Sequence, residues 1–279
     1  RKESSAASDV YKRQHIKRLL QELQTNVGGS DSSSSEYQYV NFVESALKDE
    51  EIFNSFRSDS RYRDILEHVS DDLGKKYYIK IREVLSHKEV VDICNAVKNV
   101  GNPRLLKYEG SKLNPATLRY INVGLDITKK FPNDKFKNIV EIGAGYGGQA
   151  LVLENFFEIK NYTLIDLPQV NQLIQKFFSY HDPKFQYSFS EIETYTNNGK
   201  YDLFISNYAF SELPKKLQIT AIKNVISNAK YGYMIVNNFN NFSFRYLSKA
   251  QYANNLPNLE VFDEIPESYM FNKIVTFKN

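Results

Sequence analysis

A dense cluster of glycines lies in the middle of the sequence, where residues 140–148 read Val-Glu-Ile-Gly-Ala-Gly-Tyr-Gly-Gly. Gly143 and Gly145 can adopt backbone angles that are closed to other residues, and they let a ligand approach the main chain. A helical pattern follows directly, so the unpaired amides of its first turn would face the same ligand. Nucleotide-like ligands bind at such turns; the alternative is a turn that only packs the helix tightly on its strand.

Asp166 is the second residue that could contact such a ligand. It ends the next apolar run and lies 23 residues after Gly143. An acid about 20 residues after the first glycine binds ribose hydroxyls in dinucleotide-binding folds. Asp166 also precedes Pro168 and could cap a helix there, a role that is compatible with ribose binding. The glycines and the acid together predict a nucleoside-containing cofactor.

The spacing of Gly143, Gly145 and Gly148 fits G-x-G-x-x-G, which does not by itself separate a dinucleotide from S-adenosylmethionine. Glu141 favours the second, because methyltransferases commonly carry an acid at this position, where it helps to hold the loop and the methionine end of the cofactor. The end of the chain agrees: the runs 259–265 and 273–277 are separated by only seven residues, which suits an antiparallel hairpin and not a crossover. Such a terminal hairpin is typical of methyltransferases.

Short-chain nucleotide-sugar dehydrogenases and epimerases need the pair Tyr-x-x-x-Lys on a helix after the glycines. Tyr108 and Lys112 lie before the glycines, and the pair Tyr180 and Lys184 is interrupted by Pro183. Neither pair can serve an NAD-linked enzyme of this type.

The elements that must position these residues follow from the periodicity. Short apolar runs at 138–142, 162–167, 201–206 and 233–236 alternate with helical patterns at 149–157, 170–180 and 215–228. This alternation is the signature of a parallel sheet covered on both faces by helices. With a short helix near 246–254 and the hairpin, it predicts a mostly parallel α/β sheet with a C-terminal antiparallel strand.

The part of the chain before the sheet divides in two. Residues 1–35 begin with Arg1 and a stretch that resembles adapter-derived sequence, and they end in a serine-rich linker, so we expect them to add nothing to the fold. Residues 36–132 have apolar positions three or four apart and are predicted to be helical, with Asn114-Pro115 opening the last helix. Residues 133–279 form the predicted cofactor-binding domain.

The composition bounds the class of protein. The 279 residues are 42% hydrophobic and 25% charged, with a formal charge of +3, which disfavours disorder, a coiled coil and electrostatically driven nucleic-acid binding. Cys94 is the single cysteine, which excludes an intramolecular disulfide and makes a reducing, cytoplasmic setting the default expectation. The four histidines lie far apart, so no metal site is expected. No apolar run reaches the roughly 18 residues of a membrane span.

Four segments carry a resemblance to a known family. They are the glycine segment 140–148, Tyr-Thr-Leu-Ile-Asp-Leu-Pro (162–168), Tyr-Asp-Leu-Phe-Ile-Ser-Asn-Tyr-Ala-Phe-Ser-Glu-Leu (201–213) and Gly-Tyr-Met-Ile-Val-Asn (232–237). Over about residues 100 to 279 the chain resembles the sugar O-methyltransferases of bacterial polysaccharide gene clusters. The resemblance implies a Rossmann-like class I methyltransferase fold and S-adenosylmethionine as the cofactor. It also implies a sugar, nucleotide-sugar or lipid-linked glycan as the acceptor.

The resemblance carries cofactor contacts onto Glu141, Gly143, Gly145 and Asp166. The full predicted cofactor site adds Ala144, Tyr146, Leu167 and Asn207.

Tyr208 and Asn237 are the predicted substrate-binding residues, and Asn207 too could hold a sugar hydroxyl. Any single aromatic among Tyr146, Tyr208 and Phe210 is more readily a core residue. DNA and RNA amino-methyltransferases carry Asn/Asp-Pro-Pro-Tyr where this chain has Asn207-Tyr208 without proline, which makes nucleic acid a distant interpretation.

Methyl transfer to a hydroxyl needs in-line alignment and a base that accepts the hydroxyl proton. Glu212 is the first candidate, because it lies just past the end of a strand that faces the cofactor; its alternative role is the cap of a helix beginning at Pro214. His181 is the second candidate, although a lone histidine before Asp-Pro is more often a loop residue. A sugar O-methyltransferase, an NAD-linked nucleotide-sugar enzyme and a catalytically silent methyltransferase-like binding module all stay open.

Overall fold

The computed structural model describes residues 34–196, 199–237, 239 and 246–279. The expectations for residues 1–33 lie outside this part of the chain. Helix α2 begins at Ser34, so the boundary predicted near residue 36 falls just inside it. No helix in the described ranges is long and apolar enough to cross a membrane.

The N-terminal region is helical, as predicted. Its elements are α2 (Ser34–Lys48), α3 (Glu50–Ser55), α4 (Ser60–Leu66), α5 (Asp71–Arg82), α6 (His87–Ala96), the hairpin β1 (Leu106–Tyr108) and β2 (Ser111–Leu113), and α7 (Pro115–Lys130). Asn114 caps α7, as its sequence predicted: its Oδ1 accepts from the Thr117 amide at 2.8 Å. The same kind of side-chain cap opens α3, α4, α5 and α6. These local signals explain where the helices begin.

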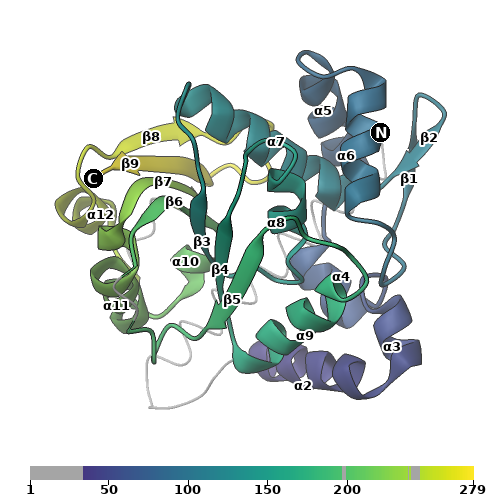
Figure 1. Cartoon of the computed structure of the whole chain (residues 1–279), viewed down its shortest axis with the longest axis horizontal. Helices are drawn as coiled ribbons and strands as arrows, with labels where there is room; N and C mark the ends of the chain where they lie inside the picture. The colour runs from purple at the N-terminus through teal and green to yellow at the C-terminus, as the bar shows by residue number, and fades with distance from the viewer. Residues whose placement is uncertain (1–33, 197–198, 238, 240–245) are drawn as a thin grey trace.

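A seven-stranded sheet forms the second part of the molecule (Figure 1). Its strands are β3 (Asn138–Ile142), β4 (Asn161–Ile165), β5 (Gln186–Ser190), β6 (Tyr201–Asn207), β7 (Ala229–Val236), β8 (Glu260–Asp263) and β9 (Lys273–Lys278). Strands β5-β4-β3-β6-β7 are parallel neighbours, and β9 runs antiparallel between β7 and β8. The predicted fold class, with its C-terminal antiparallel strand, is therefore confirmed. Strand β5 was missed because it is an edge strand whose residues are exposed or half-buried.

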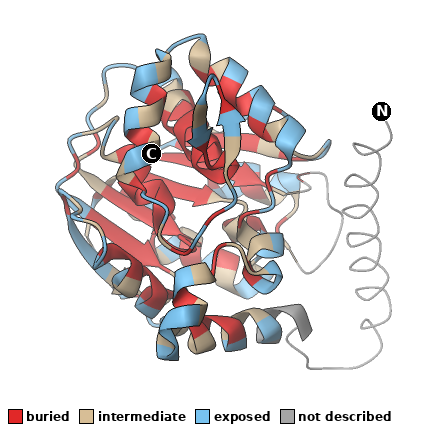
Figure 2. Ribbon diagram, turned by 90° about the vertical axis from the view of Figure 1, so that its right-hand side faces the viewer, coloured by how far each residue is buried: buried red, intermediate tan, exposed pale blue. Residues whose placement is uncertain are grey.

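Helices cover both faces of the sheet (Figure 2). They are α8 (Gly148–Leu153), α9 (Pro168–Phe178), α10 (Ala209–Glu212), α11 (Lys215–Asn224), α12 (Lys249–Asn255) and the short 3₁₀ helix η1 (Ile226–Asn228). One face, with Ile139 and Leu203, packs with α7, α8 and α9 and shares a continuous core with the N-terminal helices. The other face, with Val140 and Phe204, packs with α10, α11 and α12. The N-terminal helices therefore pack against the sheet through a shared hydrophobic core.

The strand register brings the chemically interesting residues to one edge. Ile142 pairs with Ile165, and Asn207 pairs with Ile235, so β3, β4, β6 and β7 end together. Strand β3 has β4 on one side and β6 on the other, which makes the gap between β3 and β6 the point where the strand order reverses. Ligands of open α/β sheets bind outside the carboxyl ends of the strands at this switch point.

Candidate functional site

The glycine loop leaves β3 at this edge and needs glycine for two different reasons. Gly143 has φ +78°, and a Cβ on it would lie 2.0 Å from the Cβ of Ala209, so the start of α10 packs where a side chain would stand. Gly145 has φ +60°, and its nearest neighbour is Leu66 of α4, 3.3 Å from the position of a Cβ. Ala144 is buried between them. The N-terminal helices therefore cover the loop from outside.

Asp166 closes the loop from the neighbouring strand. Its Oδ2 accepts from the Gly145 amide at 3.2 Å, and its Oδ1 accepts from the Leu167 amide at 2.8 Å. Burial raises the pKa of Asp166 to about 6, although the amides of Leu167, Gly145 and Ala144 lower it. Helix α9 begins without a side-chain cap, so the Asp166 carboxylate stabilises the glycine loop and does not cap the helix. Each oxygen keeps a lone pair that can accept from a ligand hydroxyl.

Glu141 lies inside β3, and its side chain is buried. Its Oε2 accepts from Tyr162 Oη of β4 at 2.7 Å. Burial raises the pKa of Glu141 to about 8, against the lowering effect of the Tyr162 hydrogen bond. The structure thus gives this acid a partner in the next strand, whereas the sequence interpretation expected it to hold the glycine loop.

Tyr146 points away from the edge into the core, where it is fully buried. Its hydroxyl accepts from Arg57 Nη2 at 2.9 Å. Arg57 Nε donates to Glu67 Oε1 at 2.5 Å, and Asn114 Nδ2 donates to Glu67 Oε2 at 2.9 Å. We call Arg57, Glu67, Asn114 and Tyr146 the Arg57 cluster. It ties the ends of α3 and α4 and the cap of α7 to the glycine loop, a connection that the sequence did not predict.

Asn207 ends β6 beside the loop. Its Nδ2 donates to Gln149 Oε1 of α8 at 3.0 Å. Its Oδ1 is buried and has no hydrogen-bond partner among the described residues. A buried amide oxygen without a partner is uncommon in native structures and can accept from a ligand.

A second buried polar group surrounds Tyr208, which follows Asn207 with φ +70°. Tyr208 Oη donates to Glu264 Oε1 at 2.5 Å. Ser268 donates to the other Glu264 oxygen, from its amide at 3.2 Å and from its hydroxyl. The Arg119 guanidinium of α7 lies 5.5 Å from the Tyr208 ring centre. We call Arg119, Tyr208, Glu264 and Ser268 the Tyr208 cluster.

Tyr208 is the only member of this cluster that the sequence predicts as a site residue. One signal for Glu264 was available, because it lies in the first run of the predicted hairpin, 259–265; in the structure it directly follows β8. Arg119 lies on α7, where nothing in the local sequence pattern marks it as a site residue.

Glu212 and Asn237 come together where β6 and β7 end. Glu212 Oε1 accepts from Asn237 Nδ2 at 2.8 Å, and the Asn237 amide donates to Ser211 Oγ at 3.0 Å. Glu212 is exposed and ends α10. Helix α11 begins with Pro214 as its N-cap and has no side-chain cap, so the expectation that Glu212 caps it is wrong.

His181 lies at the opposite end of α9 from this edge. Its Nδ1 is 2.8 Å from the Phe177 carbonyl oxygen, and its Nε2 is 2.7 Å from that of Val97. Helix α9 has 11 residues and so spans about 16 Å. The structure does not bring His181 to the other predicted site residues, because the helix carries it back toward the amino ends of the strands.

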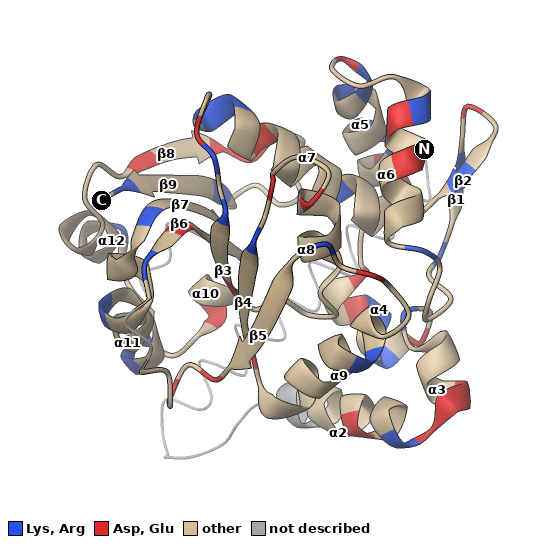
Figure 3. Cartoon of the chain, in the orientation of Figure 1, with Lys and Arg blue, Asp and Glu red and all other residues tan. Residues whose placement is uncertain are grey.

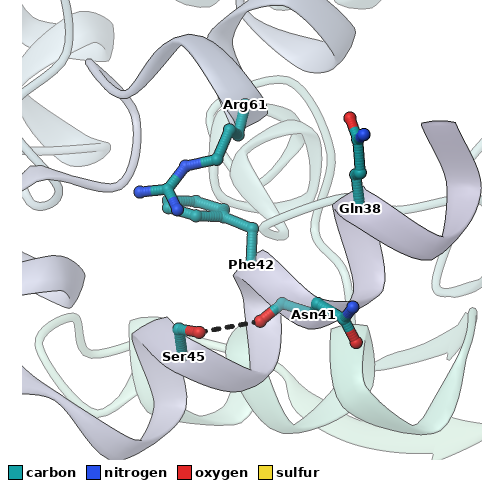
Figure 4. A pocket seen from close by; sticks show the side chains of 5 residues that line it. All are labelled: Gln38, Asn41, Phe42, Ser45 and Arg61. Carbon is teal, nitrogen blue, oxygen red and sulfur yellow. Dashed lines mark hydrogen bonds between the residues drawn. The ribbon is translucent and has the colours of Figure 1, made fainter. Parts of the chain in front are cut away.

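A pocket lies on α2 and α4, and none of the residues that line it is a predicted site residue (Figure 4). Gln38, Asn41, Phe42, Ser45 and Arg61 line it. The Arg61 guanidinium lies 4.5 Å from the Phe42 ring centre, and Ser45 Oγ donates to the Asn41 carbonyl at 2.9 Å. These contacts stabilise the helices and offer no acid or base to a reaction.

Neither a metal site nor a basic stripe is evident in the part of the chain that the structure describes. No group of three or more His, Cys, Asp or Glu side chains there could hold a metal ion. Basic and acidic residues are interspersed along the outer helices (Figure 3), whereas nucleic-acid binding favours one sign of charge along a face.

No protein-family model matches the sequence, and no curated protein matches it. Among solved structures, the chain is similar to the N-terminal domain of EvdMO1, determined in the presence of SAH and D-fucose, with 13% identity and a TM-score of 0.47 over 71% of this chain and 96% of that one. It is also similar to the N-methyltransferase NodS from Bradyrhizobium japonicum WM9, with 15% identity and a TM-score of 0.44 over 58% of this chain and 94% of that one. The assignment of an activity therefore rests on the residues of this chain.

Proposed function

We propose that the chain is an S-adenosylmethionine-dependent methyltransferase that acts on a hydroxyl of a sugar or glycan precursor. The observation that carries this proposal is the meeting of the glycine loop and Asp166 at the switch point, with the Gly145 amide 3.2 Å from the Asp166 carboxylate. The loop amides fix the acid, and its remaining lone pairs can accept from ribose hydroxyls. The sugar acceptor rests on the resemblance of the four sequence segments.

Two features support S-adenosylmethionine over NAD. The antiparallel β9 lies between β7 and β8, whereas the dinucleotide fold continues with parallel strands. The Tyr-x-x-x-Lys pairs are also misplaced for hydride chemistry. Tyr108 lies in the β1-β2 hairpin, and Tyr180 follows the end of α9 next to His181.

When bound, the cofactor would supply an electrophilic methyl group on its sulfonium. The chain has two tasks, to align the acceptor hydroxyl and to accept its proton. Asp166 and the backbone of Gly143–Gly145 would hold the nucleoside. Asn207 Oδ1, buried and without a described partner, can accept from an ammonium or hydroxyl group of a ligand.

Glu212 is the proposed base, and Asn237 orients it through their hydrogen bond of 2.8 Å. Glu264 is the buried alternative, and it would act through the Tyr208 hydroxyl that donates to it. The two positions separate in one comparison of glutamine variants. Glu212→Gln should keep cofactor affinity and lower single-turnover methylation roughly 10²- to 10⁴-fold, with Glu264→Gln retaining activity per folded molecule. The reverse result would transfer the role to Glu264.

Calorimetric titration with S-adenosylhomocysteine and with NAD tests the cofactor. We expect the wild type to bind the first and not the second. Gly145→Val should abolish binding, because a β-branched residue at φ +60° deforms the loop. Gly110→Val is the matched control: Gly110 has φ +91° with nothing within 4 Å of a Cβ, so this variant carries similar strain outside the site. NAD binding, or full affinity in Gly145→Val, would refute the proposed cofactor site.

Turnover separates an enzyme from a silent binding module. We expect surface glycans of cells that lack the gene to lose a methyl group that mass spectrometry detects, and the glycan that changes then provides the acceptor for the single-turnover assay. Cofactor binding with unchanged glycans would favour the silent module.

A further inference from the structure

Arg119 is a buried cation whose charge is not matched. It lies on α7 and is 7% exposed. Its Nη2 donates to the Leu66 carbonyl at 3.1 Å. Within the described ranges, its buried Nε has no hydrogen-bond partner, and no acid forms an ion pair with the guanidinium.

This arrangement is costly for an arginine. A guanidinium stays protonated when it is buried, so it cannot escape the desolvation cost by losing its proton. The Tyr120 and Tyr208 rings each lie 5.5 Å from the guanidinium carbon, and such contacts offset part of the cost. The Tyr120 side chain also interacts with the guanidinium through a hydrogen bond, but Nε has no acceptor among the described residues.

Arg119 lies next to residues of the proposed site. The carbonyl that Arg119 holds belongs to Leu66, whose side chain covers Gly145 at 3.3 Å from the position of a Cβ. On the other side lies Tyr208, which leaves β6 at the carboxyl edge and donates to Glu264. Arg119 thus contacts both Leu66, which covers the glycine loop, and Tyr208. Asn207 Oδ1, another buried atom without a hydrogen-bond partner among the described residues, lies one residue before Tyr208.

We propose that Arg119 recognises a carboxylate or phosphate group of a ligand bound at the carboxyl edge. Two sources can supply this anion: the amino-acid tail of the cofactor, in which case the inference rests on the proposed function, or an acidic group on the acceptor. A guanidinium suits either source, because its N–H donors match the geometry of carboxylate and phosphate oxygens.

The first arm of the test compares two ligands that differ in the amino-acid tail. S-adenosylhomocysteine has the tail, and 5′-methylthioadenosine lacks it. If the tail is the anion, Arg119→Met should weaken S-adenosylhomocysteine binding roughly 10- to 100-fold, the range for hydrogen bonds to charged groups, and leave 5′-methylthioadenosine binding unchanged. Arg119→Lys keeps the charge and should retain part of the preference.

The second arm uses glucuronate, inorganic phosphate and neutral glucose as probes of an acceptor anion. If the acceptor supplies the anion, glucuronate or phosphate should bind the wild type more tightly than glucose does, and Arg119→Met should lose this difference. Arg61→Met removes an exposed arginine of α4 and should change neither arm. Melting curves of every variant verify folding, and Arg119→Lys provides the comparison if Arg119→Met does not fold.

Either positive arm supports the proposal and identifies the source of the anion. If Arg119 variants that are folded change neither the tail preference nor the binding of the acidic probes, the proposal is overturned. A wild type that binds neither adenosyl ligand would refute the proposed function instead, and the second arm would still decide the role of Arg119.

Discussion

Two buried arginines in the N-terminal helical region have opposite surroundings. Arg57 is fully buried and has a carboxylate partner, Glu67, at 2.5 Å. Arg119 is almost as deeply buried and has no acidic partner within the described chain. Each lies beside a tyrosine that follows a strand of the sheet: Arg57 beside Tyr146 of the glycine loop, and Arg119 beside Tyr208 after β6. The difference shows that burial alone does not assign a role to an arginine. A buried arginine that is paired with an acid of the protein stabilises the fold, whereas a buried arginine without such an acid can bind an anionic ligand.

The matched arginine has a structural consequence for the site. Arg57 reaches Tyr146 in the glycine loop, while Glu67 and Asn114 hold it from α4 and α7. The loop is therefore fixed from both sides, by Asp166 on the sheet and by the Arg57 cluster on the helices. We infer that the N-terminal region preorganises the loop for its ligand.

The largest expected effect comes from breaking the matched pair. Arg57→Met leaves the Glu67 carboxylate buried without its cation, so it should lower the free energy of unfolding by about 3–5 kcal/mol. Urea denaturation measures this loss. Arg61→Met is the control, because the Arg61 side chain is 56% exposed in its ion pair with Asp59 and should cost at most about 1 kcal/mol.

A double variant sharpens the same comparison. Arg57→Met with Glu67→Met removes the stranded carboxylate and should recover most of the stability. Equal losses in the single and double variants would show that the cluster stabilises through packing and not through charge.

Glu141 extends the comparison to a buried acid that forms no ion pair with a Lys or Arg in the part of the chain that the structure describes. Unlike Arg119, it can avoid the cost of burial by keeping its proton, and its pKa is accordingly raised to about 8. The unfolded chain ionises near the ordinary value of 4.5. The unfolded state therefore gives up this proton first, and stability should fall as the pH rises between about 4.5 and 8.

The test of Glu141 compares unfolding free energies at pH 5.5 and pH 7.5. We expect the wild type to lose about 2–3 kcal/mol more than Glu141→Gln over this interval, because glutamine has no proton to lose. Asp166, whose pKa is raised in the same direction, is present in both proteins, so the difference between their pH profiles reports Glu141. Glu193→Gln, at an exposed acid, should behave as the wild type. Parallel pH profiles for the wild type and Glu141→Gln would show that Glu141 is ionised in the fold.

Local patterns made much of this architecture predictable. The alternation of strands and helices, the glycine turn and the cap at Asn114 are each set by residues close in sequence, and all were predicted except the edge strand β5. Pairs that join distant segments were not: Arg57 and Tyr146 are 89 positions apart, and Tyr208 and Glu264 are 56 apart. Only tertiary packing determines such contacts, so the sequence could not predict Arg57 and Glu264 as partners of these tyrosines.

The candidate site divides in the same way. Gly145 and Asp166 follow from motif spacing, and the structure joins them by a hydrogen bond. His181 had no motif to support it and lies at the far end of α9. Arg119 carried no signal, because an arginine in an amphipathic helix is ordinarily a solvated side chain.

The smallest effect on stability, and the most informative about the two arginines, belongs to Arg119→Met. This variant leaves no buried carboxylate without its cation. Methionine removes the desolvation cost of the unpaired guanidinium and fills a similar volume. Its free energy of unfolding should therefore lie within about 1 kcal/mol of the wild type, far from the loss expected for Arg57→Met. Urea denaturation of the two variants side by side makes the comparison. A loss of stability as large as that of Arg57→Met would mean that a group within the protein neutralises the Arg119 charge. The charge would then not be available to a ligand.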